Sequence, residues 1–207
     1  MKKHIAILDP FPRTLKLIFS KDKFKALKSR YNLIYAPKKY KKNFYDKNIH
    51  KASFIIGQPD LPKDLLLKAK KLKAVINVES NFMNNMDYQY CFKKGIHVIA
   101  TSPVFSKPVA EIALGMTLSL IRNIHTAHSD FIKGKEKYGL ESNHNASLLS
   151  GKKIGLLGFG DLAKSLYPLL LPFTKDINVY DPWIPKLNIQ NLGFKSISLN
   201  KMFESCE

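Results

Sequence analysis

Short apolar runs alternate with amphipathic stretches over the first hundred residues of the chain. The runs are rich in β-branched residues and have the length of buried strands. They are Ile5–Leu8, Leu33–Tyr35, Phe54–Ile56, Ala74–Val78 and His97–Ile99. Between them, apolar residues recur at helical spacing, as in Leu15–Leu27 and Leu65–Leu72. Such alternation is typical of a parallel sheet with helices on both faces. The pattern therefore predicts an α/β fold, with a first domain of the flavodoxin-like type over residues 1–100.

A segment with two prolines leads into a second pattern. Pro103 and Pro108 predict that no helix begins before Val109. The apolar positions that follow predict one long helix from Val109 to about Ala127, and a polar loop then spans residues 134–150. We therefore expect a second domain over residues 101–207.

The most informative feature of the second domain is a glycine turn between a predicted strand and a predicted helix. Gly158 and Gly160 follow an apolar run, and Ala163 completes the pattern Gly-x-Gly-x-x-Gly/Ala. In such a turn, the first glycine makes the tight bend and the second lets a pyrophosphate approach the backbone. The third small residue keeps the helix close to the strand. The helix N-terminus then presents N–H groups to the phosphates.

An acidic residue follows the turn at a suitable distance. Asp181 ends the apolar strand Ile177–Tyr180 and lies 21 residues after Gly160, near the offset of about 20 residues that a dinucleotide site shows. A carboxylate there accepts hydrogen bonds from ribose hydroxyls and repels a 2′-phosphate. The sequence therefore predicts NAD as the cofactor, with a purely structural turn as the alternative.

The second domain is expected to be incomplete. After Tyr180, the pattern predicts one further short strand, Phe194–Ile197, and the start of a helix, Leu199–Phe203. A complete doubly wound dinucleotide domain has about six strands. We therefore predict an incomplete Rossmann NAD-binding domain with an open sheet edge.

Composition narrows the range of partners. The net charge of +18 attracts polyanions without specificity, but almost all of the basic residues are lysines. The arginines, which offer the planar fork for specific contacts, are Arg13, Arg30 and Arg122. We therefore expect no specific nucleic-acid partner, and a basic nucleic-acid binder is the competing class.

Two other features bear on membrane association and cellular location. No stretch reaches about 18 uncharged apolar residues, so we expect no membrane partner. Cys91 and Cys206 are too few for a disulfide framework, which favours a cytoplasmic location.

His125 and His128 lie one helical turn apart, but two ligands at a helix end make a poor site, and we expect no bound metal. His97, in a strand, is expected to be a core histidine.

With these elements located, the chain resembles the D-isomer-specific 2-hydroxyacid dehydrogenases, the family that includes phosphoglycerate and formate dehydrogenases. The likeness covers nearly the whole chain. The segments that carry it are Asn85–Asp87, Gly95–Val98, Val109–Ile124, Gly158–Ala163 and Val179–Pro182. Each segment alone is loose, whereas their order and spacing together are specific.

The resemblance implies two Rossmann-like domains that hold a small 2-hydroxy or 2-keto acid and NAD, with hydride transfer between them. Carried over by position, the residues that bind NAD are Gly158, Phe159, Gly160, Asp161, Leu162 and Asp181. The resemblance also implies a homodimer through the helix of residues 109–124. The catalytic arginine, glutamate and histidine of the family come after the point where this chain ends, so we expect no catalytic residue within it. A non-catalytic NAD-binding sensor or interaction protein on the same fold is the alternative.

The chain departs from the family pattern at the substrate loop. The glycine-rich segment that binds the substrate carboxylate in the family falls on Ser80-Asn81-Phe82, where both glycines are replaced. Glu79 precedes this loop at the C-terminal tip of a predicted strand, and such tips line ligand clefts in open α/β sheets. Glu79, Ser80 and Asn81 are therefore the candidate substrate contacts. A further departure is Pro168, which is expected to interrupt the helix after the glycine turn.

Overall fold

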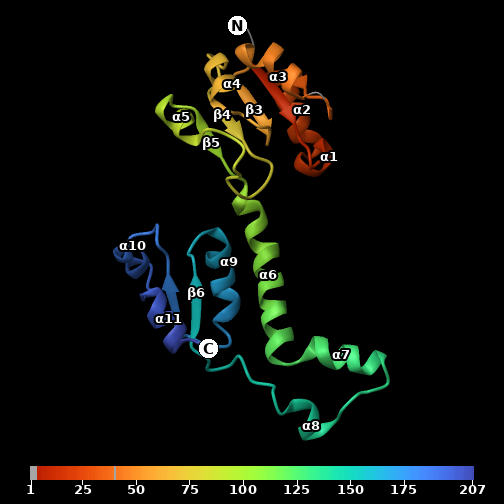
Figure 1. The fold of residues 1–207 in the computed structure, drawn as a ribbon, viewed down its shortest axis with the longest axis vertical. Coiled ribbons are helices and arrows are strands. Elements are labelled where there is room, and N and C mark those ends of the chain that lie inside the picture. The colour runs from red at the N-terminus through yellow and green to blue at the C-terminus, as the bar shows by residue number, and fades with distance from the viewer. Residues whose placement is uncertain (1–3, 40) are drawn as a thin grey trace. The chain divides into compact units, whose positions relative to one another are not determined.

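A computed structural model of the chain describes residues 4–39 and 41–207. The chain divides into two compact units, residues 1–102 and residues 103–207, and Figure 1 labels most of their elements.

The first unit contains a five-stranded parallel sheet. The strands are β1 (Ile5–Asp9), β2 (Asn32–Tyr35), β3 (Phe54–Gly57), β4 (Ala74–Ile76) and β5 (His97–Ile99). Their order is β2-β1-β3-β4-β5, and every neighbouring pair is parallel. This is the flavodoxin-like order. The predicted fold class is therefore confirmed.

Helices cover both faces of this sheet (Figure 1). They are α1 (Leu15–Ile18), α2 (Lys21–Arg30), α3 (Lys41–Asn48), the 3-10 helix η1 (Ile49–Lys51), α4 (Lys63–Lys68) and α5 (Tyr88–Lys93). Successive strand side chains point to opposite faces, so Ile7 and Ile55 enter a core built with α3, α4 and α5. Leu8 and Ile56 enter a separate core, against which residues of α1 and α2 pack.

The carboxyl ends of β1 and β3 approach each other very closely. Gly57 has φ +151°, and a Cβ atom at this position would lie 2.1 Å from the carbonyl oxygen of Asp9. Asp9 is itself buried, and its carboxylate accepts hydrogen bonds from Lys41 Nζ at 2.7 Å and from the Tyr45 hydroxyl at 3.2 Å. Only glycine fits position 57, because any side chain would collide with the neighbouring strand.

The second unit contains a three-stranded parallel sheet in the order β6-β7-β8. The strands are β6 (Ile154–Leu157), β7 (Ile177–Tyr180) and β8 (Lys195–Ser196). The helices are α6 (Ser102–Ile121), α7 (Ile124–Ile132), α8 (Gly139–Asn143), α9 (Asp161–Leu170), α10 (Lys186–Asn191) and α11 (Leu199–Ser205). Among the described strands, β6 pairs with β7 alone, so β6 lies at one edge of this sheet.

The prediction that no helix begins before Val109 is wrong. Helix α6 begins at Ser102 and contains Pro108. Pro103 lies in the first turn, where a backbone N–H has no intrahelical partner to lose, and Pro108 removes a single N–H donor from a 20-residue helix. The helix also ends before Ala127, because Asn123 adopts the left-handed conformation, with φ 55°, and α7 starts after it.

Two smaller expectations about the second unit also fail. The polar loop of residues 134–150 contains the short helix α8. Pro168 does not interrupt α9, which runs on to Leu170. Pro108 in α6 and Pro168 in α9 each remove one backbone N–H donor, and both helices continue past the proline.

Helix α6 packs one side against the core of the second unit and exposes another. Leu114, Leu118 and Ile121 contact the core cluster that contains Leu156 and Val179. Among the described residues, one helix, α6, is long enough and apolar enough to cross a membrane, by length and composition alone. One helix of this kind is weak evidence, because helices of soluble proteins pass the same test.

Candidate functional site

The two glycines of the turn after β6, Gly158 and Gly160, differ in backbone conformation. Gly158 has φ +89° and donates its N–H to the Tyr180 carbonyl at 2.7 Å, so the tight turn itself needs a glycine. Gly160 has an ordinary φ of −79° at the start of α9. Apart from its two chain neighbours, no described protein atom lies within 4 Å of a Cβ built at Gly160. Neither backbone strain nor packing requires this glycine, which is the N-cap residue of α9. The open space beside it fits the approach of a pyrophosphate.

Asp181, at the carboxyl end of β7, links the glycine turn to the segment that follows β7. One carboxylate oxygen accepts the N–H of Phe159 at 2.7 Å, and the other accepts the N–H groups of Trp183 and Ile184, both at 2.8 Å. Burial by itself raises the pKa of Asp181, but the three backbone donors outweigh it and hold the pKa below its usual value of 3.8. The three backbone hydrogen bonds therefore fix the orientation of the Asp181 carboxylate.

The other predicted cofactor residues lie around the same turn. Phe159 is buried, with its ring packed edge-on against Phe194 at 4.5 Å between centroids, and its N–H is taken by Asp181. The packing of the Phe159 ring and the hydrogen bond of its N–H therefore hold the turn in place. Asp161 and Leu162 open helix α9, whose N-cap residue is Gly160. Leu162 also lines a hollow of about 250 Å³ together with Gly158.

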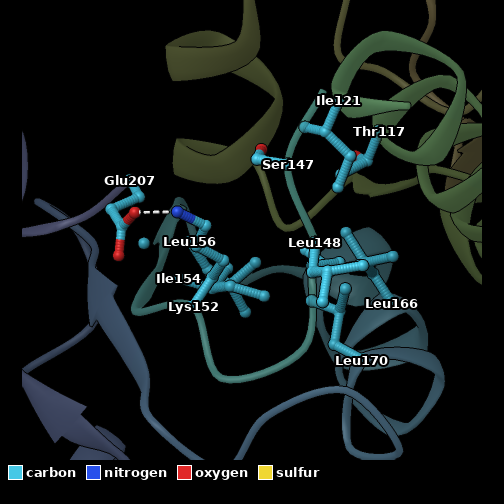
Figure 2. A pocket seen from close by; sticks show the side chains of 12 residues that line it. Thr117, Ile121, Ser147, Leu148, Lys152, Ile154, Leu156, Leu166, Leu170 and Glu207 are labelled. Atoms are coloured by element: carbon cyan, nitrogen blue, oxygen red, sulfur yellow. Dashed lines mark hydrogen bonds and ion pairs between the residues drawn. The ribbon is translucent and has the colours of Figure 1, made fainter. Parts of the chain in front are cut away.

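A second hollow of the same unit, of about 500 Å³, lies along the open edge of the sheet (Figure 2). Ile154 and Leu156 of β6 line it, together with Leu166 and Leu170 of α9. An ion pair between Lys152 and Glu207 lies at its rim. Neither the glycine turn nor Asp181 lines this hollow, so it is separate from the candidate cofactor site.

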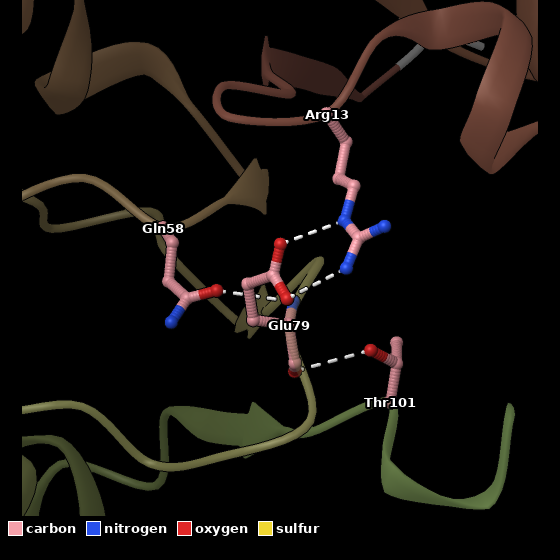
Figure 3. Close-up of polar contacts among 4 residues, drawn as sticks. All are labelled: Arg13, Gln58, Glu79 and Thr101. Carbon is pink, nitrogen blue, oxygen red and sulfur yellow. Dashed lines mark hydrogen bonds and ion pairs between the residues drawn. The ribbon is translucent and has the colours of Figure 1, made fainter. Parts of the chain in front are cut away.

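In the first unit, Glu79 is the centre of a polar cluster at the carboxyl ends of the strands (Figure 3). Its two carboxylate oxygens accept Arg13 Nε at 2.7 Å and Arg13 Nη2 at 3.0 Å. Its N–H donates to Gln58 Oε1 at 3.0 Å, and its carbonyl accepts the Thr101 hydroxyl at 3.1 Å. The Arg13 hydrogen bonds hold the pKa of Glu79 below its usual range, although burial acts in the opposite direction. Ser80 is half-buried and Asn81 is exposed, directly after this anchored residue.

Arg13 is a residue of the candidate site that sequence reasoning missed. In the sequence, Arg13 stands out only as one of the few arginines in a lysine-rich chain. Its partner lies 66 residues away, so no local spacing could have linked the two. The rarity of arginine was the available signal, because arginine rather than lysine makes a bidentate pair with a carboxylate.

The expectations about a metal site and about His97 concern other parts of the chain. Within residues 4–39 and 41–207, no group of three or more His, Cys, Asp or Glu side chains could hold a metal ion. His125 and His128 are exposed on α7. The expectation that His97 is a core histidine is wrong: it is exposed, because β5 is an edge strand of the described sheet.

Comparisons with known proteins agree with this geometry. Residues 114–207 match a family model described as "D-isomer specific 2-hydroxyacid dehydrogenase, NAD binding domain". The chain is 30% identical over 145 residues to a hydroxypyruvate reductase of Thermotoga maritima, covering 70% of this chain and 45% of that protein. It is 31% identical over 139 residues to a D-3-phosphoglycerate dehydrogenase of Methanocaldococcus jannaschii, covering 65% of this chain and 25% of that protein.

Solved structures show the same likeness. A phosphoglycerate oxidoreductase from Rhizobium etli is 41% identical, with a TM-score of 0.74 over 98% of this chain and 63% of that one. A D-lactate dehydrogenase from Aquifex aeolicus, solved with NAD and lactic acid, is 22% identical, with a TM-score of 0.68 over 98% and 58% of the two chains, and supports the fold alone. The chain spans less than half the length of the two curated relatives above.

Proposed function

Because this chain belongs to the D-isomer-specific 2-hydroxyacid dehydrogenase family, we propose that it is part of an NAD-dependent oxidoreductase. The reaction is hydride transfer between the CH–OH group of a small 2-hydroxy acid and NAD. In this proposal, residues 1–100 form the substrate domain and residues 101–207 form the first part of the NAD-binding domain. The catalytic arginine, glutamate and histidine of the family lie outside residues 1–207.

The observation that carries the proposal is the pairing of an open glycine with an oriented carboxylate. NAD, when bound, supplies the hydride acceptor. Gly160 leaves room for its pyrophosphate, and the N-terminus of α9 at Asp161 and Leu162 presents backbone N–H groups to the phosphates. Asp181 accepts a ribose hydroxyl and repels a 2′-phosphate, and its three backbone donors fix the position of the carboxylate. These residues bind and orient the cofactor and take no part in proton transfer.

The substrate side of the proposal rests on the loop that begins at Glu79. The carboxyl ends of parallel strands are where ligands bind in open α/β sheets. Glu79, Ser80 and Asn81 follow the carboxyl end of β4. They are proposed to contact a small 2-hydroxy or 2-keto acid.

A homodimer through residues 109–124 is part of the same proposal. Ile112, Met116 and Leu120 are all more than half exposed and recur at four-residue spacing, which places them on one face of α6. An apolar stripe of this kind favours contact with another protein surface. We also propose a cytoplasmic location, which the two unpaired cysteines Cys91 and Cys206 favour.

The test is turnover by the full-length protein. NADH oxidation is followed with hydroxypyruvate, glyoxylate and pyruvate as substrates, and each assay is repeated with NADPH. The proposal expects turnover of at least one 2-keto acid, with NADH preferred. An Asp181→Asn variant is expected to lose this preference, whereas Asp130→Asn on α7 serves as a matched carboxylate control.

Two results would contradict the proposal in different ways. NAD binding without turnover of any of these acids would favour the non-catalytic NAD-binding protein. Absence of both binding and turnover would show that the glycine turn is purely structural.

A further inference from the structure

The loop after β4 is held at its start by five hydrogen bonds, all made by Glu79. Glu79 is bound by Arg13 through both carboxylate oxygens, by Gln58 through its N–H, and by Thr101 through its carbonyl (Figure 3). These three partners follow β1, β3 and β5 in the chain. The start of the loop is therefore fixed to the ends of three other strands.

The far end of the loop is also anchored. Asn85 Nδ2 donates to the Pro59 carbonyl at 2.8 Å, and the Asn85 carbonyl accepts the Leu61 N–H at 2.7 Å. Between the two anchors, Asn81, Phe82 and Met83 are exposed. The shape of the exposed segment consequently depends on how its two ends are held.

Arginine at position 13 contributes orientation as well as charge. The guanidinium is planar and binds both oxygens of Glu79, so it fixes the rotation of the carboxylate, which a lysine ammonium cannot do. Arg13 also neutralises Glu79, whose side chain is 28% exposed. An anionic substrate near Ser80 would otherwise meet an uncompensated negative charge.

Resting on the proposed function, we infer that Arg13 is a positioning residue: through Glu79 it sets the orientation of the 80–82 loop that receives the acidic substrate. It acts through a second residue and does not itself react. The inference goes beyond the proposed function, which identifies the loop but not what holds it.

The first test compares Arg13→Gln with the parent in the full-length protein. We expect the KM for the 2-keto acid to rise roughly tenfold, while the Kd for NAD stays unchanged because the cofactor site lies in the other unit. Hydrogen exchange of the 79–85 segment is expected to become faster. Arg13→Lys keeps the charge without the fork and should show an intermediate KM. Asp46→Asn breaks a different ion pair of the same unit, Lys68 with Asp46 at 2.6 Å, and should leave the KM unchanged.

The double variant Arg13→Gln/Glu79→Gln separates orientation from charge. It restores neutrality but not the bidentate geometry, so the inference expects its KM to remain as high as that of Arg13→Gln. Recovery of the parental KM in this double variant would overturn the inference and leave only charge neutralisation. The inference would also be overturned if Arg13→Gln changed neither loop exchange nor KM by more than about twofold.

Failure of the proposed function is distinguishable from failure of this inference. If the parent turns over no 2-keto acid, the proposed function fails in the parent, before any variant is compared. The exchange measurement on Arg13→Gln would then still decide whether Arg13 orders the 79–85 segment.

Discussion

The two polar sites of the molecule are built in opposite ways. The site at the glycine turn uses backbone groups, and Asp181 reaches the Phe159 N–H across 22 residues of one strand-helix-strand unit. The site at Glu79 uses side chains from the ends of separate strands, and its central pair is 66 residues apart. A backbone site leaves a recognisable spacing in the sequence, whereas a side-chain site assembled by topology leaves none.

The glycines at the two sites differ in the same way. Gly57, beside Asp9 in the first unit, is required because two strands nearly touch there. Gly160, in the second unit, has open space beside it and an ordinary backbone conformation. Gly57 therefore serves the fold, whereas for Gly160 we propose a role in binding a ligand.

The largest expected effect is that of Gly57→Ala. Its Cβ atom would overlap the backbone of Asp9 at 2.1 Å, in a backbone region that alanine rarely adopts. We expect the free energy of unfolding to fall by about 4 kcal/mol or more. Chemical denaturation with circular dichroism measures it. A loss below about 1 kcal/mol would show that β1 and β3 can separate without cost.

Asp181→Asn should have the next largest effect, this time on the cofactor. Replacing the charged acceptor weakens its hydrogen bond to a ribose hydroxyl by about 2 kcal/mol, so the Kd for NAD should rise roughly 30-fold. Calorimetric titration with NAD and NADP gives both constants. An unchanged ratio of the two constants would exclude Asp181 from the ribose site.

Gly160→Ala tests whether the second glycine is kept for a ligand. We expect a smaller change in Tm than for Gly158→Ala, because Gly160 has a negative φ and, apart from its chain neighbours, no described atom lies within 4 Å of the added methyl group. The Kd for NAD should rise about tenfold if the methyl group meets the pyrophosphate. Gly158→Ala is the matched control, since φ +89° predicts a stability loss of about 1 to 2 kcal/mol. Equal effects of the two variants on Tm would contradict the distinction.

The smallest expected effect is in the acid stability of the second unit. Because the pKa of Asp181 is lowered in the folded state from 3.8, its contribution is present above that value and is lost as the pH falls through the folded pKa. Asp181 is partly exposed, so the loss should be below about 1 kcal/mol. Tm measured from about pH 5 to about pH 2 should fall more steeply in the parent than in Asp181→Asn. Parallel curves would mean that the three backbone hydrogen bonds do not depend on the charge.

The strands of both units and the glycine turn could be predicted from the sequence for a physical reason. Buried parallel strands such as β1 and β7 are nearly continuous apolar runs, and the turn after β6 needs glycine where φ is positive. These signals are local. The start of α6 was predicted wrongly because a proline restricts helices less in their first turn than in their interior.

The side-chain contacts could not be predicted because they depend on strand order. Arg13 and Glu79 meet only because β3 lies between β1 and β4 in the sheet and their carboxyl ends share one edge. The exposure of His97 likewise follows from the position of β5 at the end of the strand order. Neither fact is visible in a linear pattern.

The most direct test of the account is an NAD titration that uses Trp183 as the reporter. Trp183 is the single tryptophan of the chain, is 90% exposed and lies two residues after Asp181. The account predicts a saturable change in Trp183 fluorescence with NAD, energy transfer to bound NADH, and markedly weaker binding of NADP. A flat titration with NAD, or equal affinity for NAD and NADP, would contradict the claim that the glycine turn and Asp181 form an NAD site.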